Sequence, residues 1–140
     1  MADSRQRRTG GARSFEDLWI WQQARILVPV VYRDFGDDSP AGRDFGFRNQ
    51  AQRSAISIMN NIAEGFERMT DSDFARLLDI AKGSTGEVRS MYYAAQDLNY
   101  VSAAVAEERR SRCRQIGSGI SSLALHLRPD AGSAPRRSRR

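Results

Sequence analysis

Apolar residues recur at steps of three and four along most of the chain, which is the period of an α-helix. Four segments share this pattern, at about residues 14–35, 44–68, 70–98 and 103–127. No segment alternates apolar and polar residues for long enough to predict a β-strand. The pattern therefore predicts an all-α protein, and the short connections favour an antiparallel up-down-up-down four-helix bundle.

Capping and helix-breaking residues refine these segments. Ser14, with Asp17 three positions later, is a candidate N-cap for the first segment, and Thr70 begins a run of capping residues before the third. Pro29 lies inside the first segment and predicts a kink, because proline removes a backbone hydrogen bond. The small residues at 83–86 interrupt the third segment. They either let a neighbouring backbone approach closely or separate two shorter helices.

The first and second segments each carry two adjacent apolar rows, whereas a helix in a monomeric bundle needs one inward-facing stripe. An apolar face that remains after the bundle closes is best buried against another copy. We therefore expect a homo-oligomer, with a wide core stripe in a monomer as the alternative. The candidate interface residues are Trp19, Ile56, Met59 and Phe66.

The length of 140 residues fits a single domain, and 40% hydrophobic with 28% charged residues is typical of a soluble globular protein. No apolar run approaches the roughly 20 residues that a membrane helix needs. The N-terminal segment also lacks the apolar core of a signal peptide. We therefore expect a cytoplasmic protein with no membrane association.

The net charge of +5 is unevenly distributed, because residues 15–127 carry −2 and the two ends carry the excess of arginine. Residues 1–14 and 128–140 are rich in Gly, Ser or Pro, and we expect them to be disordered arms. One interpretation is that the arms bind the phosphate backbone of a nucleic acid without recognising its base sequence. The alternative is that they keep a small protein soluble. The candidate nucleic-acid-binding residues are Arg5, Arg7, Arg8, Arg13, Arg136, Arg137, Arg139 and Arg140.

The residues that most often carry metal or nucleophilic chemistry are scarce. Cys113 is the only cysteine and His126 the only histidine, whereas most zinc and iron sites use several such ligands. Cys113 falls on the apolar row of its segment, which is typical of a small buried residue. We therefore expect no metal, no cofactor and no enzymatic activity.

Several strings resemble a known family. These are the first-segment string at residues 18–22, the string Asn61-Ile62-Ala63-Glu64-Gly65, and Ala81-Lys82-Gly83-Ser84 followed by Glu87. Over about residues 15–127 the chain resembles small four-helix-bundle proteins that are associated with intervening sequences of bacterial large-subunit ribosomal RNA genes. The resemblance implies an antiparallel bundle, a ring-like homopentamer and an association with nucleic acid.

A related family serves as accessory subunits of diversity-generating retroelements. It is similar in fold and uses a basic body to bind a reverse transcriptase and nucleic acid. The net charge of −2 over residues 15–127 departs from that pattern. The leading hypothesis is therefore a non-enzymatic homo-oligomer that binds RNA or DNA through its arginine-rich ends. The alternative is a protein-binding scaffold or accessory subunit that recruits a partner enzyme such as a reverse transcriptase.

The polar residues of the matched strings form two pairs, Asn61 with Glu64 and Ser84 with Glu87. Each pair has a spacing of three, so its members share a helix face. If the second and third helices pack antiparallel, the two pairs could meet. They would then form either a carboxylate pair for acid–base chemistry or a hydrogen-bond network that fixes helix register or a subunit contact. The sequence favours the network.

Overall fold

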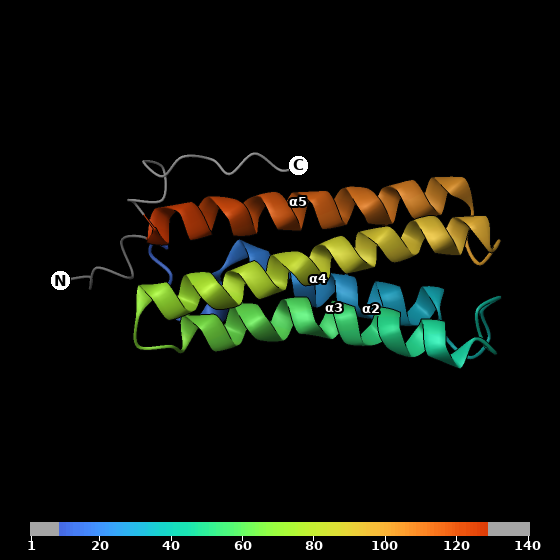
Figure 1. The fold of residues 1–140 in the computed structure, drawn as a ribbon, viewed down its shortest axis with the longest axis horizontal. Coiled ribbons are helices and arrows are strands. Elements are labelled where there is room, and N and C mark those ends of the chain that lie inside the picture. Colours follow the sequence, from blue (N-terminus) through green and yellow to red (C-terminus); the bar gives the residue numbers. More distant parts are fainter. Residues whose placement is uncertain (1–8, 129–140) are drawn as a thin grey trace, which may run out of the picture.

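A computed structural model describes residues 9–128, and within that range it contains only helices, turns and loops. The 3-10 turn η1 precedes four long helices that lie side by side along one axis (Figure 1). The elements are η1 (Phe15–Asp17), α2 (Trp19–Asp34), α3 (Phe45–Phe66), α4 (Asp71–Asp97) and α5 (Ala103–Leu127). The predicted all-α fold with four helices is confirmed.

Two polar contacts fix the relative direction of α4 and α5. Arg110 Nη1 donates a hydrogen bond to Gln96 Oε1 at 3.0 Å, and Arg128 Nη1 donates to Asp79 Oδ2 at 2.8 Å. From Arg110 to Arg128 along α5, the partner on α4 moves back from Gln96 to Asp79, so the two helices run in opposite directions. The connection at residues 98–102 is short enough to permit only such a reversal.

All four helices contribute side chains to one continuous core. Phe35, at the end of α2, lies at one end of this core, with its ring centroid 5.2 Å from Tyr92 and 5.0 Å from Phe47. Close packing of such large side chains supplies most of the driving force for folding. The largest fully buried side chains include Tyr92, Phe35, Phe74, Leu27, Ile58, Ile62, Leu78, Ile116 and Ile120.

A partly buried ionic cluster joins α2 to α4 and α5. Asp34 accepts hydrogen bonds from Tyr92 Oη at 2.7 Å and from Arg109 Nε and Nη2 at 2.8 and 3.1 Å. Burial, together with the Asp34 carboxylate, raises the pKa of Tyr92 far above its ordinary value, so the phenol keeps its proton and stays a donor. The cluster therefore holds the C-terminal end of α2 against the other helices.

The start of α2 differs from the prediction. Ser14 makes no side-chain capping bond and precedes only η1, so the expectation that it caps the first α-helix is wrong. The backbone N–H of Arg13 instead donates to Asp17 Oδ2 at 2.9 Å. Leu18 adopts an extended backbone and is buried, which separates η1 from α2. Thr70, in contrast, caps α4 as predicted, because its side chain accepts from Asp73 N at 3.1 Å.

The glycines of α4 and α3 have different surroundings. α4 is continuous from Asp71 to Asp97, so the predicted alternative of two shorter helices is wrong. The alternative of close approach holds within this run at Thr85, whose hydroxyl would be 3.2 Å from a Cβ added at Gly117, but not at Gly83 or Gly86, where an added Cβ would meet nothing within 4 Å. The tight contact lies at Gly65, where an added Cβ would come within 2.9 Å of Phe74 Cδ1.

These surroundings predict opposite effects for two glycine substitutions. Gly65→Ala should lower the free energy of unfolding by about 1–3 kcal/mol, because the Phe74 ring and backbone must shift. Gly83→Ala should raise it by up to about 1 kcal/mol, because alanine favours the helix and meets open space. Urea unfolding followed by circular dichroism measures both. A Gly65→Ala protein as stable as the Gly83→Ala protein would contradict the packing at Gly65.

Candidate functional site

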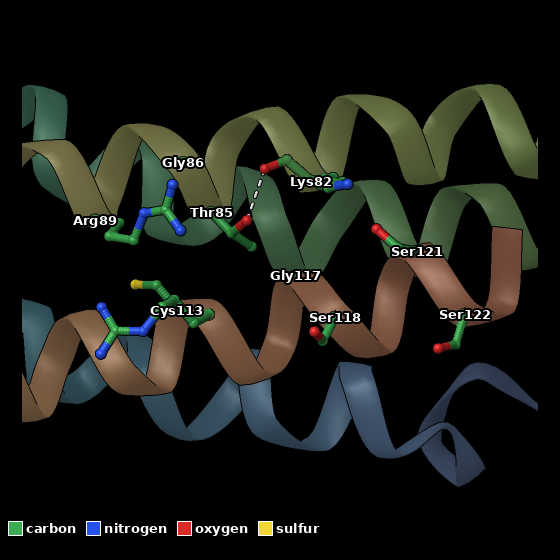
Figure 2. A pocket seen from close by; sticks show the side chains of 10 residues that line it. Lys82, Thr85, Gly86, Arg89, Cys113, Gly117, Ser118, Ser121 and Ser122 are labelled. Atoms are coloured by element: carbon green, nitrogen blue, oxygen red, sulfur yellow. Dashed lines mark hydrogen bonds between the residues drawn. The ribbon is translucent and has the colours of Figure 1, made fainter. Parts of the chain in front are cut away.

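α4 and α5 are in close contact near the middle of both helices. Thr85 Oγ1 would be only 3.2 Å from a Cβ added at Gly117, and it donates a hydrogen bond to Lys82 O at 2.6 Å (Figure 2). Because Gly117 has no side chain, the threonine hydroxyl lies directly against α5. The two helix backbones therefore approach closely here, and the longer side chains beside this contact must point away from it.

A cleft of about 550 Å³ opens over this contact, between α4 and α5 (Figure 2). Its walls carry three cationic side chains and four hydroxyl groups, and no carboxylate lines it. Such a combination suits an anionic ligand, because cations and hydroxyls both donate hydrogen bonds to phosphate oxygens. The lining residues are Lys82, Thr85, Gly86, Arg89, Cys113, Arg114, Gly117, Ser118, Ser121 and Ser122.

The cations of the cleft differ in their partners. Arg114 Nη2 pairs with Glu107 Oε1 at 2.6 Å, whereas within residues 9–128 Lys82 and Arg89 form no salt bridge. Lys82 and Arg89 are seven residues apart on α4, so they share a face about 10 Å apart along the axis. The cleft is therefore locally positive, although residues 15–127 carry a net charge of −2.

Cys113 lies at the base of this cleft with its sulfur toward Arg89 (Figure 2), and it is 1% exposed. Burial raises the pKa of Cys113 to about 12, against a lowering by the charges of Arg89 and Arg114. The thiol is therefore neutral at pH 7, and the prediction of a buried cysteine is confirmed. Neutral thiols are poor nucleophiles.

A second group of polar side chains lies between α3 and α4. The Ser57 and Ser84 hydroxyl oxygens are 2.9 Å apart, and Asn61 Nδ2 donates to Ser57 O at 2.8 Å and to Ser57 Oγ at 3.0 Å. Ser54 Oγ donates to Glu87 Oε2 at 2.6 Å. From Ser54 to Ser57 along α3, the partner on α4 moves back from Glu87 to Ser84. The two helices are therefore antiparallel, and these contacts fix their register.

Three of the four predicted polar residues, Asn61, Ser84 and Glu87, take part in these contacts. Glu64 does not, because it is exposed and pairs with Arg68 Nη2 at 2.6 Å. The α3 partner of Glu87 is Ser54, ten residues from Glu64 and therefore about 15 Å away along the helix. The alternative of a carboxylate pair for acid–base chemistry is therefore wrong.

The candidate interface residues fall into different environments. Trp19 is 49% exposed on α2, and Ile56 and Met59 are partly exposed on α3. Phe66 is only 9% exposed, and its ring centroid lies 5.9 Å from that of Phe74. Phe66 is therefore part of the protomer core, and its assignment to an outer interface is wrong. The reason is that Gly65 lets the end of α3 approach α4 closely.

A groove of about 530 Å³ lies beside the exposed side of α2, next to α5. Ile26, which is 47% exposed, and Pro29 line its apolar part, and Arg25 and Arg33 line its edge. Ile26 lies seven residues after Trp19, so the two exposed side chains share one stripe of α2. This stripe is an apolar surface that the bundle itself leaves uncovered.

The predicted arms lie mostly outside the described residues. Arg13 is exposed, Ala12 is buried in the core, and Arg128 pairs with Asp79. The ordered contacts of the bundle thus extend beyond residues 15–127 at both ends. The candidate arginines outside the described range are Arg5, Arg7, Arg8, Arg136, Arg137, Arg139 and Arg140.

Metal ligation and membrane crossing are two further possibilities for residues 9–128. Within that range no three His, Cys, Asp or Glu side chains are grouped so that they could hold a metal ion. In the same part of the chain, no helix combines the length and the apolar character needed to cross a membrane.

Comparison with known proteins gives the family. The family model described as 23S rRNA-intervening sequence protein matches residues 16–122, which cover most of η1, all of α2, α3 and α4, and most of α5. The chain belongs to this 23S rRNA-intervening sequence protein family. The resemblance drawn from the sequence is thereby confirmed. Comparison with curated proteins finds no match.

Sequence reasoning missed the positive cleft of this family member. The sequence predicts nucleic-acid binding by the arms, because the charges of residues 15–127 sum to −2 and hide the local excess of positive charge. The available signal was the spacing of seven between Lys82 and Arg89, with Gly86 on the same face. Arg114 belongs to a group of arginines at residues 109–114, for which the sequence favours a solvated, ion-paired helix face with a phosphate-facing patch as the alternative. Only the packing of α5 on α4 brings Arg114 to the cleft.

The environment of Cys113 predicts slow alkylation. At pH 7.5 iodoacetamide should modify Cys113 at least a hundredfold more slowly in the folded protein than in urea, because the thiol is buried and its pKa is raised. The rate should still be rising with pH at pH 10, above the range where a free thiol levels off. Mass spectrometry measures the reaction. Equal rates in folded and unfolded protein would contradict this environment.

Proposed function

We propose that this protein is a non-enzymatic, homo-oligomeric helical bundle that binds RNA or DNA through phosphate contacts. The observation that carries the proposal is the cleft between α4 and α5, where Lys82, Arg89 and Arg114 meet with no lining carboxylate. Phosphate groups are the chemistry that such a cluster fits best. The arginine-rich ends would add further contacts of the same, sequence-independent kind.

The proposal of a non-enzymatic role rests on what the reactive groups do in the bundle. Cys113 is buried and held neutral. The hydroxyl groups of Ser57 and Ser84 form a hydrogen bond with each other, and the Ser54 hydroxyl donates a hydrogen bond to Glu87. These contacts stabilise the α3–α4 register, which gives the polar residues of the family strings a structural role.

The proposal of self-association rests on the uncovered stripe of α2. Trp19 and Ile26 are each about half exposed, and Ile26 lines the groove together with Pro29. An apolar stripe of this kind is best covered by another protein surface, and a second copy is always present at the same concentration. The ring-like homopentamer that the family resemblance implies is the assembly we propose.

Salt dependence tests the nucleic-acid proposal. Affinity for a fluorescein-labelled 20-nucleotide RNA should fall at least tenfold between about 50 and 200 mM NaCl, because phosphate contacts release counterions. Removing residues 1–8 and 129–140 should weaken binding at 50 mM and reduce the salt slope. Fluorescence anisotropy measures both, and the truncation keeps Ala12 in the core and the Arg128–Asp79 pair. An affinity independent of salt would contradict phosphate binding.

Light scattering tests self-association. The purified chain at micromolar concentration should show about five times the 15.7 kDa mass of one protomer. Ile26→Asp should reduce that mass, because it places a charge on the α2 stripe. Ile80→Asp, at a residue of similar exposure on α4, is the matched control and should leave the assembly intact. A single-protomer mass for the unmodified chain would rule out the oligomer, and an unchanged assembly in Ile26→Asp would rule out the α2 surface.

A further inference from the structure

We propose that the cleft between α4 and α5 binds the sugar–phosphate backbone of a single RNA strand and makes no sequence-specific contact with its bases. This inference rests on the proposed function and assigns it to a specific surface of the folded bundle. The arms then add affinity, but the cleft selects a single strand over a duplex. Its argument depends on the shape of the cleft, on its donors and on the residue types that line it.

The cleft is elongated along the helix pair. A second cavity of about 190 Å³ shares Lys82 and Ser121 with it and continues toward Asp79 and Arg128. That continuation is lined by Asp79 and by apolar side chains, so the phosphate-binding part is the cleft itself. From Lys82 to Arg89 the cleft follows seven residues of α4, or about 10 Å. At about 3.4 Å for each stacked nucleotide of a strand, this length accommodates about three nucleotides. A compact anion such as inorganic phosphate would occupy only a fraction of it.

Five donors of the cleft are free to bind a ligand, whereas Arg114 pairs with Glu107 and Thr85 donates to Lys82 O. Lys82 and Arg89 form no salt bridge within the described residues. The hydroxyls of Ser118, Ser121 and Ser122 form no hydrogen bond to another side chain or backbone group within that range. Cations bind phosphate oxygens, and serine hydroxyls bind phosphate oxygens and the 2′-hydroxyl of RNA. Both walls of the groove thus present donors suited to a ribose–phosphate chain.

The lining lacks aromatic and amide side chains. Proteins that recognise single-stranded bases stack them on aromatic rings, and amide side chains hydrogen-bond to base edges. The residues that line the cleft are Lys, Thr, Gly, Arg, Cys and Ser alone. Bound bases would therefore point away from the protein, and affinity would be insensitive to base sequence. A duplex presents a rigid convex surface, which would not reach the buried Thr85 and Gly117 at the base of the cleft.

Two charge-reversed double variants of the full chain test the cleft with a matched control. Lys82→Glu/Arg89→Glu alters the cleft, and Arg43→Glu/Arg53→Glu makes the same change in net charge at exposed arginines outside it. With labelled 20-nucleotide oligo(U) RNA, the cleft variant should lose at least thirtyfold in affinity and the control less than fivefold. Circular dichroism confirms that both variants fold.

Gly86→Leu tests occupancy of the cleft without changing charge. A Cβ at Gly86 meets nothing within 4 Å, so the leucine fills the cleft and leaves the core intact. It should weaken oligo(U) binding at least fivefold, whereas Gly83→Leu, at a helical glycine that is equally open but outside the cleft, should not. In the unmodified chain, oligo(A) should bind within threefold of oligo(U). A duplex RNA of the same length should bind at least fivefold more weakly.

The outcomes separate this inference from the proposed function. If the full chain binds no RNA at about 50 mM salt, both fail. If it binds but the two charge-reversed variants lose affinity equally, or Gly86→Leu binds normally, the cleft inference fails and binding belongs to the arms. Tighter binding of duplex, or competition by inorganic phosphate at the concentration where a four-nucleotide RNA competes, would overturn the single-strand assignment.

Discussion

The arrangement of the bundle depends on how closely α4 approaches its neighbours. Proteins pack their interiors densely, so the size of the side chains at a helix contact sets the separation of the backbones. Small residues occupy these contacts, with Gly65 against Phe74 between α3 and α4 and Gly117 against Thr85 between α4 and α5. The same close approach leaves the long cationic side chains of α4 and α5 on either side of a cleft.

Arginine has two distinct uses in this chain. Arg48 donates to the carbonyls of Phe35 and Gly42 and holds the loop between α2 and α3, and Arg109 binds Asp34. These side chains are largely withdrawn from solvent, and their charge is compensated where they lie. Lys82 and Arg89 lie instead where no carboxylate lines the surface. The net charge of the bundle therefore says little about the charge that a ligand would meet.

Much of the fold could be predicted from the sequence, because helical periodicity and caps are local properties. The apolar row that begins at Phe74 predicts α4, and Thr70 predicts its start. The contacts between helices were less accessible. The apolar pattern predicts an outer surface for Phe66, but the close packing at Gly65 places it in the core. The spacing predicts that Glu64 and Glu87 could meet, although the register of α3 and α4 pairs Glu87 with Ser54.

The sequence by itself determined the four helices, the all-α class and the family, since these follow from residue spacing and from short strings of residues. Only the tertiary structure decided which side chains share a surface. Lys82 and Arg89 lie on one face of α4, but Arg114 and the three serines reach them only through the packing of α5. A cleft between two helices depends on their separation and register, and neither quantity is encoded in the pattern of one helix alone.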